Sequence, residues 1–215
     1  MDSRSDINRI RVNDEISFTL PRGPVGLSFS AGLDSTILFY LLAQQCKEDL
    51  HLFTTAMVPR EFHAMRYAAD VMLWVQKRTG KKNMFQHVTV KGDANDVLGG
   101  NGLYETPSVY YSQGIVKSVV TGHNALPRDV DLGWPEPDSK EYNIRTPYET
   151  RSIEFSENWF SPLTNLNKKG IAQLYLENGA IQLAHLTNSC YTKYHEEPCK
   201  QCFACKEKYW GFGFY

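Results

Sequence analysis

Apolar and polar positions along the chain form blocks that predict alternating strands and helices. Residues 24–30 (PVGLSFS) are a short apolar run typical of a buried strand, and residues 34–46 continue with a helical apolar pattern. A second apolar run at 50–58 predicts another strand. An amphipathic pattern at 61–78 then predicts a helix that ends at Gly80.

The alternation continues through the middle of the chain. Residues 84–90 and 116–121 predict strands, and a helix is expected near 106–114, after a loop rich in Gly and Asn at 92–102. Strands that alternate with helices in this way favour a parallel sheet covered by helices on both faces.

The last third of the chain has a different pattern. After Gly122, residues 125–150 hold four of the ten prolines and many charges, which indicates a long surface loop or flap. A helix at about 167–178, closed by Gly179, then precedes a cysteine-rich end.

Composition narrows the class of protein. The chain has 215 residues, 42% of them hydrophobic, which is enough for one substantial core. The net charge of -1 gives no global basic field, so nonspecific binding to nucleic acid or membranes is not expected. The polar N-terminus resembles neither a secretion signal nor an anchor, and we expect a cytoplasmic protein.

Four of the five cysteines are close together near the C-terminus, with the spacing C-x8-C-x2-C-x2-C. These are Cys190, Cys199, Cys202 and Cys205. The odd count and the absence of a secretion signal argue against a disulfide framework, and the spacing is typical of a thiolate metal site. Cys46 lies on an apolar helix pattern and is expected in the core.

The metal expected at this site is a structural Zn²⁺, because four thiolates complete a tetrahedron and leave no open position. His195 is an alternative ligand, and an iron–sulfur cluster is an alternative occupant of four thiolates.

The turn at Ser30–Thr36 lies between the first strand and the following helix. Backbone N–H groups at a helix N-terminus attract anions, small residues allow a phosphate to approach, and hydroxyl groups add donors. The sequence therefore predicts a phosphate site that is neither a Walker loop nor a G-x-G-x-x-G motif. The alternative is a helix N-cap provided by Asp34 or Ser35.

These motifs carry a resemblance to a known family. The stretch SFSAGLDST resembles the pyrophosphate loop S-G-G-x-D-S-T of the PP-loop ATP pyrophosphatases, with Ala31 at the first glycine. The C-terminal half is similar to the QueC family of 7-cyano-7-deazaguanine synthases, in which P-L-x2-L-x-K, T-x-S-C-Y and C-x2-C-x2-C occur in this order. The resemblance covers about residues 24–124 and 160–206.

The resemblance implies a Rossmann-like parallel sheet with helices on both faces, of the adenine nucleotide alpha hydrolase type, and a C-terminal zinc knuckle. It divides the chain into four parts: an N-terminal extension (1–23), a PP-loop nucleotide-binding core (24–124), a substrate flap (125–160), and a C-terminal helix with the four-cysteine zinc-binding region (161–215).

The implied activity is that of an ATP-dependent ligase that forms a C–N bond. PP-loop enzymes cleave ATP between the α and β phosphates and transfer AMP to a substrate oxygen, which a nitrogen or sulfur nucleophile then displaces. QueC-like members convert 7-carboxy-7-deazaguanine to an amide and then to 7-cyano-7-deazaguanine (preQ0), with ammonia and ATP. Two alternatives stay open: a PP-loop enzyme acting on another carboxylate or nucleobase, and a nucleotide-binding assembly protein without turnover.

The resemblance also assigns residues to the ATP site. The nucleotide-binding set is Ser28, Ser30, Ala31, Gly32, Leu33, Asp34, Ser35, Thr36, Gly122, His123 and Asn124. The catalytic set is Asp34, Ser35 and Lys168, and Asp34 is expected to hold Mg²⁺ jointly with the phosphates. Lys168 could instead be an exposed lysine at a helix start, and His123 either a general base or a structural hydrogen-bonding residue.

The substrate residues are expected in the flap. Asp129, Asp131, Glu136 and Asp138 are candidates for pairing with the N–H edge of a deazaguanine, Trp134 for stacking, and Arg128 and Arg145 for its carboxylate. Each could equally be a solvated loop residue. The expected partners are a small-molecule 7-deazaguanine acid and ammonia, without nucleic acid or membrane, and a homodimer is among the open oligomeric states.

Overall fold

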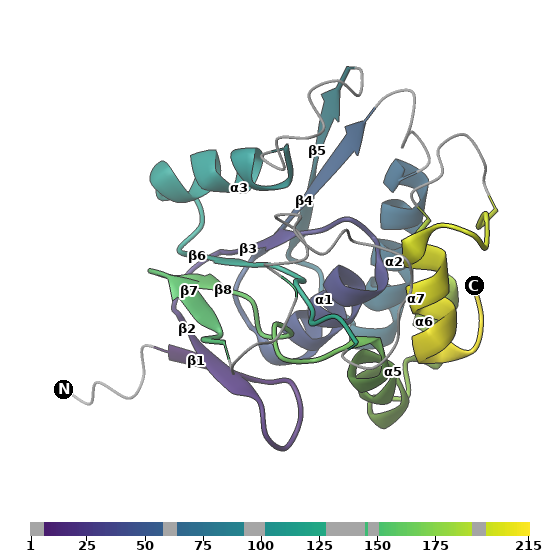
Figure 1. The fold of residues 1–215 in the computed structure, drawn as a ribbon. Helices are drawn as coiled ribbons and strands as arrows, with labels where there is room; N and C mark the ends of the chain where they lie inside the picture. Colours follow the sequence, from purple (N-terminus) through teal and green to yellow (C-terminus); the bar gives the residue numbers. More distant parts are fainter. Residues whose placement is uncertain (1–6, 58–63, 93–101, 128–144, 146–150, 191–196) are drawn as a thin grey trace.

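The computed structural model describes residues 7–57, 64–92, 102–127, 145, 151–190 and 197–215 (Figure 1). The strands are β1 (Ile7–Arg11), β2 (Ser17–Pro21), β3 (Val25–Ser28), β4 (Leu50–Met57), β5 (Met84–Lys91), β6 (Ser118–Val120), β7 (Glu154–Ser156) and β8 (Trp159–Phe160). The helices are α1 (Leu33–Gln45), α2 (Ala64–Thr79), α3 (Gly102–Ser112), α5 (Lys168–Glu177), α6 (Ile181–His185) and α7 (Phe203–Phe212).

A six-stranded sheet with the order β5-β4-β3-β6-β8-β7 forms the centre of the fold. β3 pairs in parallel with β4 on one side and with β6 on the other, so that Val25 lies between Leu50 and Ser118. β4–β5 and β6–β8 are also parallel, and only β7 runs antiparallel to its neighbour β8. The carboxyl ends of β3 and β6 therefore lie side by side, where ligands bind in open parallel sheets.

Helices cover both faces of the sheet. α1 and α2 pack on one face, and α3 packs on the opposite face (Figure 1). The larger core includes Leu27, Leu38 and Leu52, all at most 1% exposed. A smaller core on the α3 side contains Phe53. There Gly26 allows close packing, because a Cβ at this position would lie 2.9 Å from the Phe53 ring.

The expected parallel sheet with helices on both faces is confirmed. Short elements were missed: a separate antiparallel hairpin, β1–β2, precedes β3, and β7 and β8 extend the sheet from within residues 125–160. The four-part domain division stays a prediction. Among the described residues, no helix is both long and apolar enough to cross a membrane.

The C-terminal helices lie beside α1, close to the start of that helix. α5 contacts α1, α6 and α7. The hydroxyl of the buried Tyr175 on α5 donates to the carbonyl oxygen of Leu33, the first residue of α1, over 2.7 Å. α5 is thereby packed against the start of α1, directly after the loop that follows β3.

Candidate functional site

The predicted phosphate loop leads directly from β3 into α1. The helix begins at Leu33, and its N-cap is Gly32, which has no side chain to cap the helix. Asp34 and Ser35 lie within the first helical turn, so the alternative that one of them is the N-cap is wrong. The first helical hydrogen bond runs from the Thr36 N–H to the Gly32 carbonyl over 3.0 Å. The backbone amides of residues 33–35 therefore precede the helical ladder, which is the arrangement that binds anions at helix N-termini.

Hydroxyl groups hold the turn in shape. Ser30 Oγ and Ser35 Oγ lie 3.2 Å apart, Ser35 Oγ donates to the Gly32 carbonyl, and Ser30 Oγ accepts from the Gly32 N–H. Ala31 is fully buried with a φ of 56°, in the left-handed region that favours glycine. Ala31 thus replaces the glycine of the family motif at a position whose backbone conformation glycine adopts more readily.

The loop that follows β6 closes one side of this turn. A Cβ on Gly122 would lie 2.8 Å from the Ser35 amide nitrogen and 3.1 Å from the Asp34 carbonyl carbon. Gly122 therefore permits the two segments to approach each other at the start of α1. Gly122 thus lies against the loop, and Asn124 Oδ1 lies 3.4 Å from Lys168 Nζ; their assignment to nucleotide binding stays a prediction.

Lys168 reaches the loop from the first turn of α5. Asn167 caps this helix, because its side-chain oxygen accepts from the Lys169 and Gly170 amides. Lys168 Nζ donates to Asp34 Oδ1 over 2.7 Å and lies 3.4 Å from Asn124 Oδ1. Lys168 is only 4% exposed, so the alternative of an exposed lysine at a helix start is wrong.

The ion pair lies among further buried charges. Burial raises the pKa of Asp34 above its usual value, and the adjacent Lys168 ammonium opposes that rise. Glu207 on α7 lies 3.5 Å from Lys168 Nζ and forms an ion pair with Arg145. Sequence reasoning missed Glu207, because a single acid on a helix has no recognisable spacing, and it placed Arg145 in the substrate flap.

His123 lies just beyond the carboxyl end of β6 and is hydrogen-bonded through Nε2 to the Tyr104 hydroxyl. Burial lowers its pKa, and the Arg145 and Arg151 guanidinium groups lower it further. The imidazole is therefore neutral at pH 7. Its pairing with Tyr104 fits the structural alternative, and a neutral imidazole also fits a general base, so both roles stay open.

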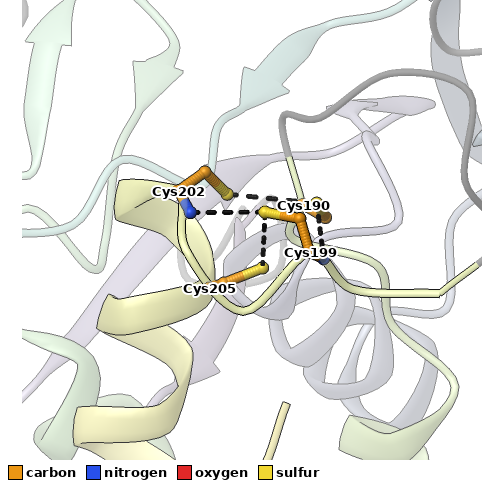
Figure 2. Close-up of side chains that lie close together, drawn as sticks. All are labelled: Cys190, Cys199, Cys202 and Cys205. Carbon is orange, nitrogen blue, oxygen red and sulfur yellow. Dashed lines mark hydrogen bonds between the residues drawn. The ribbon is translucent and has the colours of Figure 1, made fainter.

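The four C-terminal cysteines converge on one point (Figure 2). Their sulfur atoms all lie within 4.8 Å of one another. Two of the separations, Cys199 to Cys205 and Cys190 to Cys202, are 3.9 Å. A single ion with bonds of about 2.3 Å to four sulfurs gives edges of about 3.8 Å. The sulfur positions therefore fit one tetrahedrally bound metal ion.

The surrounding backbone supports this arrangement. The Cys202 amide lies 3.3 Å from Cys199 Sγ and the Gln201 amide 3.5 Å from it, so the turn directs two N–H groups at one sulfur. Burial raises the pKa of the Cys205 thiol, so metal binding would have to displace a proton there. Cys46 is separate from this cluster and is 4% exposed, in the core as expected.

The cysteine cluster and the phosphate loop are connected through Asn188. The Asn188 side-chain oxygen accepts from the Cys190 amide over 2.9 Å, and the Asn188 amide donates to the Ala31 carbonyl over 3.3 Å. Several other predicted residues lie outside the described residues, namely Arg128, Asp129, Asp131, Trp134, Glu136, Asp138 and His195.

Family models match two separate parts of the chain. The asparagine synthase model matches residues 20–87, and the model of queuosine biosynthesis protein QueC matches residues 137–215. The resemblance to the PP-loop ATP pyrophosphatases, which use ATP to adenylate a substrate, is thereby confirmed. Within this class, the C-terminal match is to QueC, and it contains Lys168 and all four cysteines of the cluster.

Solved structures with a similar fold come from several organisms. U34-tRNA thiolase NcsA from Methanococcus maripaludis, with its [4Fe-4S] cluster, is 13% identical over 86% of this chain and 64% of its own, with a TM-score of 0.47. NMN synthetase from Francisella tularensis is 12% identical over 90% and 77%, with a TM-score of 0.49. NH3-dependent NAD synthetase from Campylobacter jejuni is 15% identical over 75% and 66%, with a TM-score of 0.47. The chain thus spans less than two thirds of the thiolase chain. The search of curated proteins found no match.

Proposed function

We propose that this chain uses ATP to adenylate a carboxylic acid and then forms a C–N bond with ammonia. The observation that carries the proposal is the contact between Lys168 Nζ and Asp34, 2.7 Å long. It joins the segment that matches QueC to the segment that matches asparagine synthase, at the anion-binding start of α1.

The chemistry gives each part of the site a role. A carboxylate is a poor electrophile, so its oxygen first attacks the α-phosphorus of ATP, and pyrophosphate leaves. The amides of residues 33–35 bind the departing pyrophosphate, each well-placed donor contributing about 3 kcal/mol. The Ser30 and Ser35 hydroxyls add donors once they turn from their partners within the loop toward the phosphate. Lys168 adds a positive charge. Mg²⁺, held by Asp34 jointly with the phosphates, would neutralise the charge that develops there.

Ammonia then attacks the carbonyl carbon of the acyl adenylate, and AMP leaves. With 7-carboxy-7-deazaguanine the product is the amide. A second ATP adenylates the amide oxygen, and loss of AMP and a proton gives the nitrile, 7-cyano-7-deazaguanine. Two ATP molecules and one ammonia are therefore consumed for each nitrile formed. The match to QueC supports this substrate.

We propose that the cysteine cluster holds one structural Zn²⁺. The 3.9 Å sulfur separations support this choice, because they fit four thiolates that share one ion. In a [4Fe-4S] cluster each thiolate binds a different iron, and in a [2Fe-2S] cluster the four thiolates bind two irons, so in both cases the four sulfurs extend beyond the 4.8 Å found here. Metal analysis should give about one zinc per chain. Iron with visible absorbance would instead identify a cluster.

The activity is tested by incubating the chain with Mg²⁺-ATP, ammonia and 7-carboxy-7-deazaguanine, followed by mass spectrometry for AMP, pyrophosphate and product. Asp34→Ala and Lys168→Met should each lower turnover at least ~100-fold, as loss of a strong transition-state contact does. Lys169→Met is the matched control, because Lys169 is exposed and its ammonium lies over the Trp210 ring.

The nucleotide products distinguish the alternatives. ADP as the sole nucleotide product would overturn the adenylation mechanism. AMP formed only with other acids or nucleobases would keep the mechanism and replace the substrate. Nucleotide binding without any turnover would instead support the assembly protein. If the deazaguanine is the substrate, alanine at one or more of Asp129, Asp131, Glu136 and Asp138 should raise its KM and leave ATP binding unchanged.

A further inference from the structure

Glu207 is a buried carboxylate to which the proposed reaction gives no role. It lies on α7 and is 3% exposed. One carboxylate oxygen pairs with the Arg145 guanidinium and lies 3.4 Å from Asn124 Nδ2, and the other oxygen lies 3.5 Å from Lys168 Nζ. A carboxylate is costly to bury unless it is paired, so these partners account for its presence.

The charges in this cluster balance. Asp34 and Glu207 are the acids, Lys168 and Arg145 are the bases, and the Lys168 ammonium lies between the two carboxylates. Asp34 is the more exposed of the two acids, with 20% of its side chain accessible against 3% for Glu207. Asp34 is therefore the acid that can turn toward a ligand, while Glu207 stays within the protein.

We propose that Glu207 is a positioning residue that holds the Lys168 ammonium at the start of α1, so that Lys168 stays in place when Asp34 engages the magnesium nucleotide. The part of this inference that concerns nucleotide rests on the proposed function. Glu207 itself acts through Lys168.

The packing of α7 supports this role. A Cβ at Gly211 would lie 2.7 Å from Lys168 Cβ and 2.8 Å from the Lys168 carbonyl oxygen, so α7 lies directly against the residue whose ammonium it holds. Arg145 is fixed in turn, because its Nε donates to the Asn124 carbonyl over 3.2 Å and its guanidinium lies 5.4 Å from the centre of the Phe203 ring. Glu207 therefore contacts Lys168 from a helix that packs directly against this residue.

The first test measures the accessibility of Lys168 without any nucleotide. Trace labelling with acetic anhydride and peptide mass spectrometry are applied to the parent chain, to Glu207→Gln and to the control Glu177→Gln, which changes an exposed acid of α5. Labelling of Lys168 should rise at least ~5-fold in Glu207→Gln alone, since loss of the carboxylate permits local opening. Lys208, which is 3% exposed against 4% for Lys168, is the internal reference and should stay protected.

The second test measures binding of α,β-methylene-ATP with Mg²⁺ by calorimetry. Glu207→Gln should weaken binding ~10-fold in the parent background and less than ~2-fold in Lys168→Met, because coupled residues are not additive. Unchanged Lys168 labelling in Glu207→Gln, a joint rise of Lys168 and Lys208, or full additivity would each overturn the proposal.

Two further outcomes are also decisive. If the parent chain does not bind the nucleotide but Lys168 labelling rises alone, ATP use fails and the positioning role stands. If Glu207→Gln does not fold, Arg145→Lys takes its place, because it removes the planar guanidinium that fixes Glu207 and keeps the charge. Lys168 labelling should then rise in that variant, and unchanged labelling would reject the role.

Discussion

Single residues of the phosphate loop show where this chain differs from the family motif. Ala31 has a φ of 56° and is completely buried. The left-handed conformation costs a residue with a Cβ about 1–2 kcal/mol, whereas glycine adopts it freely. The chain therefore holds the loop in shape against local strain, with help from the Ser30 and Ser35 hydrogen bonds.

Ala31→Gly should leave the free energy of unfolding unchanged or raise it by up to about 1 kcal/mol, because relief of the strain offsets the greater freedom of glycine in the unfolded chain. Ala69→Gly is the control, since Ala69 is exposed within α2 and should lose about 1 kcal/mol. Chemical denaturation of both variants gives the comparison. Equal losses in the two variants would show that Ala31 is not strained.

Gly122 is the complementary case, in which a side chain has no room. Gly122→Ala would place a methyl group 2.8 Å from the Ser35 amide nitrogen, so the start of α1 would have to move away from the β6 end. We expect at least ~10-fold weaker binding of Mg²⁺-α,β-methylene-ATP, as displaced donors lose their contacts. Gly179→Ala is not a fair control because of its φ of 59°, whereas Gly92→Ala meets no atom within 4 Å. Equal affinities of Gly122→Ala and Gly92→Ala would argue against a nucleotide at this turn.

At the scale of elements, the sequence predicts best where the pattern is long. The strand at 50–58 and the helix at 34–46 agree with β4 and α1 to within one residue at each end, because each is a long, nearly continuous apolar run. β7 and β8 have three and two residues, too few for a period, and β7 is exposed throughout. Their pairing depends on partners distant in sequence, which local patterns do not show.

The same reasoning applies to the candidate site. Lys168 and the cysteines could be predicted, because each belongs to a motif with fixed spacing. Glu207 and Asn188 could not, since their roles arise only when α7 and the segment before Cys190 fold back onto the phosphate loop.

The adjacent strands β4 and β5 carry a histidine pair that predicts acid sensitivity. His51 Nδ1 and His87 Nε2 lie 2.9 Å apart, and His87 is also close to the Tyr110 hydroxyl. Burial lowers the pKa of both imidazoles; Asp49 opposes the shift at His51, and His51 adds to the shift at His87. Below pH ~6.5 the unfolded chain takes up protons that the folded chain does not, so the free energy of unfolding decreases as the pH is lowered.

His87→Gln should therefore lose less unfolding free energy than the parent chain between pH 7.5 and pH 5.5. Urea denaturation at both pH values measures the two differences. If the free energy of unfolding decreases equally in variant and parent between these pH values, the histidine pair does not take up protons on unfolding.

At the scale of the whole molecule, segments distant in sequence meet at one place. The start of α1 is contacted by the end of β6, by the first turn of α5, by the segment before Cys190 and by α7 through Lys168. α7 also carries Cys205, one of the four clustered thiols. Two series of contacts therefore connect the cysteine cluster to the phosphate loop. One passes through Asn188, and the other passes through Glu207 and Lys168.

Removing the proposed Zn²⁺ from the cysteine cluster should consequently weaken nucleotide binding as well as stability. Bound metal stabilises the folded state, and without it the four sulfurs lose the ion that would hold them together. After chelation, removal of the chelator and return of Mg²⁺, we expect a lower Tm and ~10-fold weaker binding of α,β-methylene-ATP. Hydrogen exchange should become faster in residues 187–190 and in α7.

Cys199→Ser should reproduce these changes, whereas Cys46→Ala should keep both the metal and the nucleotide affinity, because Cys46 lies in the core apart from the cluster. Calorimetry and metal analysis on the same samples separate the two effects. If the metal-free chain binds the nucleotide as tightly as the loaded chain, the contacts through Asn188 and Glu207 do not transmit the state of the cysteine cluster to the phosphate loop.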